Sequence, residues 1–392
     1  MTIINTTEKK SVILAVQSEG RGHMTQAIAV KDMLNKLNME VCCVIVSSSN
    51  RREIPEFFKQ KFDVPIVSLE SPHFVTGTDN KAIRIGSTAW KNMLKIGSYH
   101  RSIKIIHKLI SFHKADLIIN FYEPLIGLYR LFHKPSCKIL SIAHQYVYLH
   151  PAFRFPAGNW FQRQALIQYS RLTSLKSDMI LAISQYDLPR SKNKNLIVIP
   201  PLLRSELFGL QAQDKNFILV YLVNSGYMSD ILRWHKNNPA SKLHCFTDCK
   251  KVKEVYSGEW IVDETLSFHS LNDKKFLDMM ASCSGMATTA GFESVCEAMY
   301  LCKPLLVVPV QGHFEQYCNA RDTQQTGAGI HSGQFKLEKL QQYMGFHQQK
   351  NEVFRQWVDK KEPTVLNAIK TLFSQPKNEA QESAVYTLQH TN

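Results

Sequence analysis

The sequence predicts an α/β protein made of two doubly wound domains, each built on a mainly parallel β-sheet. Two segments open in the same way, with a short apolar strand, a glycine-containing loop and then a helical pattern. The first is strand 12–16 with loop 17–23, and the second is strand 217–223 with loop 224–226. Short apolar runs separated by helical stretches follow both segments, and this alternation favours parallel strands joined by crossover helices.

The first half of the chain carries seven predicted strands. Its opening helix shows apolar residues at spacings of three and four, a long helical zone spans 89–113, and a further helix spans 160–175. Pro200 and Pro201 then interrupt regular structure, so we place the first domain at 1–205. The strands are predicted at 12–16, 41–46, 66–69, 116–120, 138–143, 179–183 and 196–199.

The second half continues the same alternation over residues 206–375. Residues 376–392 form a polar tail that we expect to be mobile. The predicted strands of this half lie at 217–223, 243–247, 260–262 and 304–310, with a strand or turn at 286–289. Its helices are predicted at 273–282 and 292–301.

Composition narrows the class of protein. Of the 392 residues, 44% are hydrophobic and 20% are charged, which excludes a disordered or fibrous chain. Lys and Arg number 47 against 33 Asp and Glu, a formal charge of +14, so we expect an anionic partner. No nucleic-acid-binding module is recognisable, which leaves an anionic membrane surface or a phosphorylated small molecule.

Cysteine spacing and hydropathy indicate the compartment. The nine cysteines show no repeating spacing, which favours reduced thiols and no structural metal. The N-terminus lacks the apolar core of a signal peptide, and no apolar run reaches the length of a membrane span. We therefore expect a cytoplasmic protein.

The loop EGRGH, residues 19–23, joins the first strand to the first helix. Gly20 and Gly22 allow a tight turn and leave room for a ligand, while the helix N-terminus offers free N–H groups. Such a loop suits an anion or a polar sugar. A tight turn without a ligand is the alternative, since the loop is neither a P-loop nor a complete G-x-G-x-x-G.

A longer motif, TTAGFESVCEAMYLCKPLLVVPVQGHFEQYCNA, covers residues 288–320. Gly291 and Phe292 open a helix whose N-terminal N–H groups can hold a diphosphate. Glu297, further along that helix, can accept hydrogen bonds from a ribose diol. Glu315 and Gln316 follow the next strand, where open α/β sheets bind ligands, and suit hexose hydroxyls. The alternatives are a solvated helix carboxylate and a surface amide.

This motif resembles the GT-B glycosyltransferases, in the branch of the bacterial peptidoglycan-precursor N-acetylglucosaminyltransferase and the natural-product UDP-glycosyltransferases. The resemblance implies two Rossmann-like domains facing a central cleft, with the acceptor in the first and the nucleotide-sugar in the second. Matching positions are Gly291, Glu297, Ala298, Pro304, Pro309, Glu315, Gln316, Asn319 and Ala320.

The resemblance also implies the reaction. A hexosyl group would pass from a nucleoside diphosphate sugar, UDP-linked in this branch, to an acceptor hydroxyl with inversion. No cofactor is expected, and no Asp-x-Asp at a strand end indicates a metal. Helix N–H groups would stabilise the departing diphosphate, with Arg204 as a candidate cation. The acceptor can be a glycan, a lipid-linked compound or a small molecule.

The resemblance assigns individual roles as well. His23 takes the position of the base that deprotonates the acceptor, for which its near-neutral pKa is suited. Glu123 is a candidate partner of His23 or the base itself, and a solvated Glu-Pro turn is its alternative. Related enzymes contact the donor phosphates through the loop here formed by Asn224, Ser225 and Gly226.

The helical zone near residues 84–114 interleaves apolar and basic side chains. Such a helix can lie on an anionic membrane as a peripheral anchor, or it can be a core helix with a solvated basic face. Two other functions also fit the motifs. One is a UDP-N-acetylglucosamine 2-epimerase on the same scaffold, and the other is a non-catalytic nucleotide-sugar-binding or membrane-assembly subunit.

Overall fold

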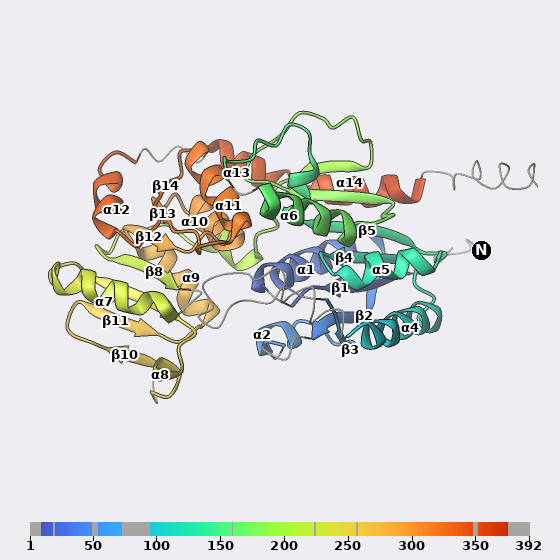
Figure 1. Cartoon of the computed structure of the whole chain (residues 1–392), viewed down its shortest axis with the longest axis horizontal. Helices are drawn as coiled ribbons and strands as arrows, with labels where there is room; N and C mark the ends of the chain where they lie inside the picture. The colour runs from blue at the N-terminus through green and yellow to red at the C-terminus, as the bar shows by residue number, and fades with distance from the viewer. Residues whose placement is uncertain are drawn as a thin grey trace, which may run out of the picture.

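A computed structural model describes residues 9–18, 20–48, 54–72, 95–158, 160–222, 225–255, 258–347 and 352–374. It contains two seven-stranded sheets that lie side by side (Figure 1). The predicted domain boundary at 205/206 falls at the start of a 3-10 turn, Ser205–Gly209, between the two sheets. The predicted tail, 376–392, lies outside the described residues.

The first sheet is parallel throughout, in the order β3-β2-β1-β4-β5-β6-β7. The chain therefore starts in the middle of the sheet, adds strands on one side, and then crosses to add strands on the other. This order is that of a Rossmann-like sheet. The strands are β1 (Lys10–Val16), β2 (Met39–Ser48), β3 (Ile66–Glu70), β4 (Leu117–Phe121), β5 (Lys138–Ala143), β6 (Met179–Ile183) and β7 (Leu196–Ile199).

The second sheet has the order β10-β11-β9-β8-β12-β13-β14, with only its edge strand β10 antiparallel. It repeats the doubly wound plan of the first sheet. The sequence did not predict β11 or β14, and the apolar run 304–310 forms a strand over three residues only. The strands are β8 (Ile218–Leu222), β9 (Leu243–Thr247), β10 (Glu259–Ile261), β11 (Leu266–His269), β12 (Gly285–Thr288), β13 (Leu305–Val307) and β14 (Gly329–His331).

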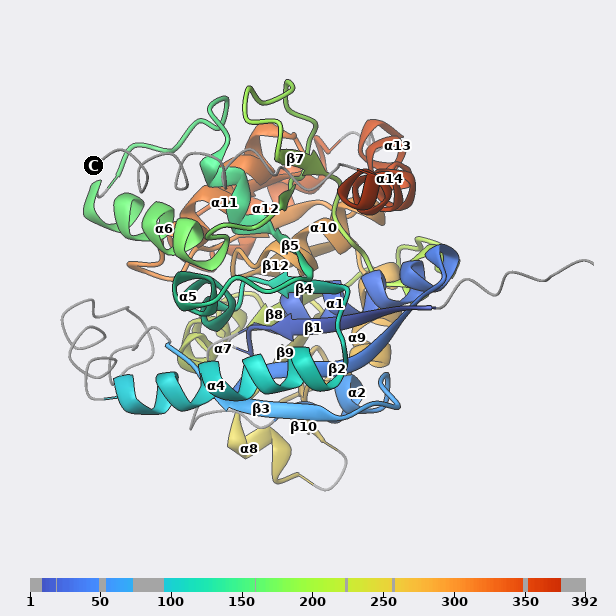
Figure 2. The same ribbon diagram turned by 90° about the vertical axis from the view of Figure 1, so that its right-hand side faces the viewer.

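Helices cover both faces of the first sheet, which explains why its central strands are apolar on both sides. In β1, Val12, Leu14 and Val16 face one apolar core, and Ile13 and Ala15 face another. The first core contains α1 and α14, and the second contains α4 and α5 (Figure 2). The helices of this half are α1 (Arg21–Leu34), α2 (Glu56–Lys59), α4 (Ile96–Phe112), α5 (Pro124–Phe132) and α6 (Trp160–Thr173).

The second sheet is also covered on both faces. Helices α7, α8 and α12 pack on one face, and α9, α10 and α13 pack on the other. The core beneath α9 and α10 is continuous with the core beneath α1, so the two halves share one apolar cluster. The helices are α7 (Met228–Lys236), α8 (Lys250–Lys253), α9 (Asp273–Ser282), α10 (Phe292–Tyr300), α11 (Phe314–Gln325), α12 (Leu337–Met344), α13 (Glu352–Asp359) and α14 (Lys361–Ser374).

The last helix returns to the first half of the molecule (Figure 1). Helix α14 contacts α1 and β7, although it follows the second sheet in the chain. Before it, Trp357 of α13 donates a hydrogen bond from Nε1 to the carbonyl oxygen of Ser184, 3.0 Å away. The C-terminal helices therefore join the two halves by a second connection, in addition to the linker after β7.

Helix α4 occupies part of the predicted helical zone. Tyr99, Ile103, Ile106 and Ile110 are buried against the first sheet, while basic side chains are exposed on the opposite face. The basic and apolar residues of 73–94 lie outside the described residues. Over its described part, this segment packs its apolar face on the first sheet and leaves its basic face exposed.

Candidate active site

The candidate site lies where the carboxyl ends of the two sheets meet. In each sheet the strand order reverses at a central pair, β1 with β4 and β8 with β12. Open α/β sheets bind ligands at such a switch point, beyond the carboxyl ends of the strands. Helices α1 and α10 begin there, and their first turns contact one another across the boundary between the halves.

Gly22 allows this contact between helices. A Cβ atom at position 22 would lie 2.9 Å from Cγ of Glu293 on α10, closer than carbon atoms approach without a shift. A Cβ at Gly20 would meet nothing within 4 Å. Gln26 then donates a hydrogen bond from Nε2 to Oε1 of Glu293, 2.5 Å away. The second glycine of the loop is therefore explained by close packing of the two halves.

His23 lies in the first turn of α1 and is 7% exposed. Burial lowers its pKa from 6.5 to about 4, against the opposing effects of the Glu315 charge and a hydrogen bond with Gln26. The imidazole is therefore neutral at physiological pH, the form that can accept a proton. Its Nδ1 is buried and has no partner in the described part of the chain.

Tyr122 supports the imidazole from one side, a role for which no signal was visible in the sequence. The two rings stack with centroids 5.6 Å apart and an angle of 23° between their planes. Tyr122 follows β4 with φ of 61°, a left-handed conformation that is costly for a residue with a side chain. Its hydroxyl is 2.8 Å from Oγ of Ser170, which holds the ring in place.

Glu123 is completely buried, and its hydrogen bonds go to Ser71 and to the start of α5. Its Oε1 accepts hydrogen bonds from Oγ of Ser71, at 2.5 Å, and from the backbone N–H of Leu125, at 3.0 Å. It thus caps α5. Burial raises its pKa to about 7. Within the described ranges, no hydrogen bond joins Glu123 to His23.

Glu297 and Arg204 form an ion pair. From the sequence they were two unrelated candidates, one for the ribose and one for the diphosphate. Arg204 lies in the linker after β7, and its Nε donates to Oε1 of Glu297 across 2.6 Å. Glu297 is 1% exposed, and its Oε2 has no partner among the described residues. Oε1 of Glu297 therefore binds the linker.

Asn319 and Phe292 make contacts across the two halves. Oδ1 of Asn319 lies 2.7 Å from Nε2 of His144 and accepts from the hydroxyl of Tyr148 at 3.2 Å. The ring of Phe292 stacks on His144 with centroids 3.8 Å apart. His144 directly follows β5, so its position at a strand end was the one signal in the sequence that could have identified it.

Glu315 and Gln316 begin α11, a helix that the sequence did not predict. Oε1 of Glu315 accepts a hydrogen bond from Nε2 of Gln145 in the first half, at 3.1 Å. Oε1 of Gln316 accepts from the backbone N–H of Val310, at 2.9 Å, and so closes the loop after β13. Glu315 thus faces the first half, while Gln316 holds the loop in shape.

A cavity of about 620 Å³ borders this loop, within the size range of small-molecule sites. It lies at the carboxyl ends of β13 and β14, with two residues contributed by the first half. Gly291 is the N-cap of α10 and is not among the residues that line the cavity. Asn224 lies outside the described residues, and Ser225 and Gly226 begin the turn that reaches the cavity at Tyr227. The lining residues are Gly158, Gln162, Tyr227, Asp230, Pro309, Val310, Gln311, Gly312, His313, Phe314, Tyr317, His331, Gly333 and Gln334.

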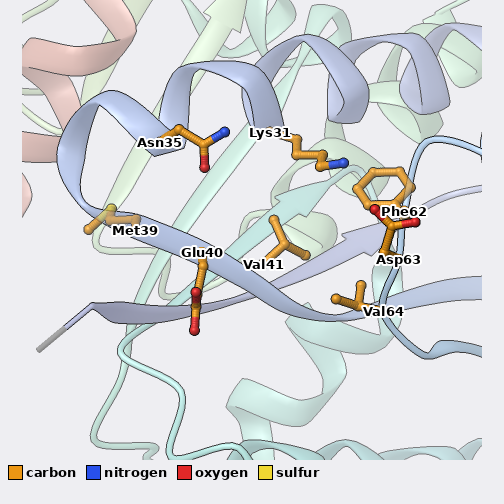
Figure 3. A pocket seen from close by; sticks show the side chains of 8 residues that line it. All are labelled: Lys31, Asn35, Met39, Glu40, Val41, Phe62, Asp63 and Val64. Carbon is orange, nitrogen blue, oxygen red and sulfur yellow. The ribbon is translucent and has the colours of Figure 1, made fainter.

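A second hollow, of about 140 Å³, lies elsewhere on the first half (Figure 3). It is placed between the end of α1 and the start of β2, at the amino edge of the sheet. None of the predicted site residues lines it. Its lining residues are Lys31, Asn35, Met39, Glu40, Val41, Phe62, Asp63 and Val64.

Neither a metal centre nor a membrane span is found in the described part of the chain. Among those residues, no three His, Cys, Asp or Glu side chains are grouped so that they could hold a metal ion. No described helix is both long enough and apolar enough to cross a bilayer.

Two Rossmann-like sheets that meet at their carboxyl edges define the GT-B class, and solved structures show the same fold. Acinetobacter baumannii MurG is 16% identical, with a TM-score of 0.54 over 93% of this chain and 99% of that one. Phytolacca americana UGT2, complexed with UDP-2-fluoroglucose and pterostilbene, is 10% identical, with a TM-score of 0.57 over 93% and 100%. The spinosyn forosaminyltransferase SpnP is 9% identical, with a TM-score of 0.58 over 94% and 100%.

The sequence itself identifies the family. Residues 10–346 match the model of glycosyl transferase family 1, and the chain belongs to that family. It is a glycosyltransferase enzyme, and the predicted GT-B fold is confirmed. No curated protein matches the chain significantly.

Proposed function

We propose that this enzyme transfers a hexosyl group from a UDP-linked sugar to an acceptor hydroxyl, with inversion and without a divalent metal. The observation that carries the proposal is His23, a buried and neutral imidazole at the carboxyl end of β1, beside the start of α10. A neutral imidazole in this position can remove the proton of an alcohol as its oxygen attacks.

The donor is assigned to the second half. The first turn of α10 offers N–H groups to a diphosphate, and the cavity beside the 309–314 loop has room for a sugar nucleotide. The free oxygen of Glu297 can accept from a ribose hydroxyl, and Glu315 can accept from the hexose. The UDP-2-fluoroglucose named with the plant structure supports a UDP-linked donor.

The reaction needs no group beyond these. His23 takes the acceptor proton, the acceptor oxygen bonds to the anomeric carbon, and the bond from that carbon to the diphosphate breaks. Attack opposite to the leaving group inverts the anomeric centre. The negative charge on the departing diphosphate is stabilised by the helix dipole of α10. Arg204, bound through Nε to Glu297 on the same helix, is a candidate for a second positive group near this helix.

We propose a cytoplasmic enzyme that associates peripherally with anionic membrane through the exposed basic face of α4. This placement supports an acceptor that is lipid-linked, with a free glycan or a small molecule as the other acceptor classes.

The proposal is tested with purified enzyme, a panel of nucleoside diphosphate hexoses and a panel of acceptor alcohols. We expect UDP release that depends on the acceptor, a product of inverted anomeric configuration by NMR, and turnover that persists in EDTA. Epimerised donor without transfer would contradict the proposal, as would donor binding without turnover. Loss of activity in EDTA, restored by Mg²⁺ or Mn²⁺, would contradict metal independence.

A further inference from the structure

Glu293 places a carboxyl group at the helix end that the proposed function assigns to the donor diphosphate. It lies in the first turn of α10, with its Cγ against Gly22 of α1. Gln26 of α1 donates a hydrogen bond from Nε2 to Oε1 of Glu293, 2.5 Å away. The protein therefore carries an acidic side chain of its own where an anionic ligand is expected.

Buried polar atoms without partners occur on both helices and in the loop before α10. Oε2 of Glu293 is inaccessible to solvent and has no hydrogen bond among the described residues, although the side chain as a whole is only half-buried. The same holds for Oε1 of Gln26, a residue 2% exposed. Oγ1 of Thr289, fully buried in the loop before α10, also lacks a partner. A buried polar atom without a partner needs an explanation, and a bound ligand or an ordered water can supply the missing hydrogen bond.

The charges around Glu293 favour its neutral form. Arg21 of α1 is paired with Asp273 of α9 at 2.9 Å, and Arg204 is paired with Glu297 on α10 itself. His23 on α1 is neutral. The two cations thus have carboxylate partners of their own. Burial, followed by the charge of Glu297, raises the pKa of Glu293 to about 8, against the hydrogen bond from Gln26 and the charge of Arg204.

We propose that Glu293 determines whether the α10 site accepts a diphosphate: the site binds the donor while Glu293 is protonated and rejects it once Glu293 ionises. A protonated carboxyl is a hydrogen-bond donor and can bond a phosphate oxygen, whereas a carboxylate beside a diphosphate is a like-charge contact in a poorly solvated place. The inference rests on the proposed function, because it takes the nucleoside diphosphate to bind at α10.

The test is binding of UDP to the full-length chain, measured by calorimetry from about pH 6.5 to pH 9.5. For a group that must be protonated and titrates near pH 8, the dissociation constant should rise about tenfold from pH 7 to pH 9. Glu293→Gln keeps the shape of the side chain and cannot ionise. It should remove this rise, and at pH 9 should bind UDP about tenfold more tightly than the wild type.

Two matched variants complete the design. Glu264→Gln removes an exposed carboxylate of the second half and should follow the wild type. Gln26→Met removes the hydrogen bond that favours the ionised carboxyl and keeps the side-chain volume, so the rise should move to higher pH. Thermal unfolding by circular dichroism shows whether each variant is folded, and the Gln26→Met result tests the inference should Glu293→Gln fail to fold.

Parallel pH dependence in the wild type and Glu293→Gln would overturn the inference while leaving the proposed donor site standing. Absence of UDP binding in all variants at every pH would overturn the proposed function together with the inference.

Discussion

Arg204 and Glu297 lie 93 residues apart in the chain, and an ion pair of 2.6 Å between Nε and Oε1 joins them at the boundary of the two halves. Arg204 belongs to the linker that leaves the first sheet, and Glu297 belongs to the helix that we assign to the donor. The pair therefore connects the path of the chain between the halves with the candidate donor site. The same contact thus borders both the linker and the candidate donor site.

Glu297→Ala should weaken both stability and donor binding. It leaves the Arg204 side chain, which is 20% exposed, without its carboxylate partner, a change that costs on the order of 3 kcal/mol of unfolding free energy. The apparent KM for the donor should rise about ten- to a hundred-fold, because a hydrogen bond to a charged group is lost. Denaturant unfolding and steady-state kinetics measure the two effects separately.

The double variant Arg204→Met with Glu297→Leu is the matched control, since it removes both charges and keeps apolar volume. It should recover most of the stability while the donor KM stays high. Recovery of the normal KM in this variant would remove Glu297 from the donor site.

His23→Ala should lower kcat by about 10²- to 10⁴-fold with UDP affinity retained, as expected for the loss of a positioned base. Glu123→Gln should cause a smaller loss, because Glu123 caps α5 and is not hydrogen bonded to His23. If His23→Ala keeps its kcat while Glu123→Gln is inactive, the base is the carboxyl group of Glu123 and not His23.

The pH profile of kcat/KM separates the same two candidates. The pKa of His23 is lowered to about 4, so activity that requires its neutral form should stay flat between about pH 5.5 and 7.5. The pKa of Glu123 is raised to about 7, so an acidic limb centred there would indicate the carboxylate as base.

The lowered pKa of His23 also makes the free energy of unfolding depend on pH. The unfolded chain binds more protons than the folded protein between about pH 4 and the ordinary value of 6.5. The contribution of His23 is thus fully present above pH 6.5 and is lost as the pH falls toward 4. In His23→Gln, unfolding measured across this window should depend less on pH than in the wild type.

Gly22→Ala should destabilise the protein by about 1–3 kcal/mol, because the new methyl group would lie 2.9 Å from Cγ of Glu293. Gly20→Ala, in the same loop, should lower the free energy of unfolding by only about 0.5 kcal/mol. Its Cβ would meet nothing within 4 Å, and the small cost arises because alanine is a poorer N-cap than glycine. Adding Glu293→Ala to Gly22→Ala should restore part of the loss. Equal melting temperatures for the two single variants would contradict the packing assigned to Gly22.

Anionic vesicles should bind the enzyme weakly, and salt should release it, because exposed charges are screened beyond about 8 Å at physiological ionic strength. Reversal of the exposed Arg101, Lys104 and Lys108 of α4 to Glu should abolish sedimentation with the vesicles. Reversal of the exposed Lys236, Lys242 and Lys339 in the second half is the matched control and should leave it intact. Binding that ignores salt and lipid charge would contradict the electrostatic contact.

Local patterns predicted the parts of the molecule that depend on neighbouring residues. The helix predicted at 273–282 has those bounds, and the one predicted at 292–301 ends one residue earlier. The apolar strands of the first half appear where they were expected, since a run buried on both faces is visible in the sequence alone. Short polar elements such as β14 and α11 were missed, because their apolar residues are too few to show a period.

The sequence by itself determined the fold class, the family and the loops that carry the candidate ligand-binding residues. Tertiary structure decided which of those side chains meet. It paired Glu297 with Arg204, placed Tyr122 against His23, turned Glu123 toward Ser71, and brought Gln26 to Glu293 across 267 residues of chain. Periodicity and capping act over one or two turns of chain, whereas these contacts form only when two sheets pack edge to edge and bury their loops together, so local sequence could not reveal them.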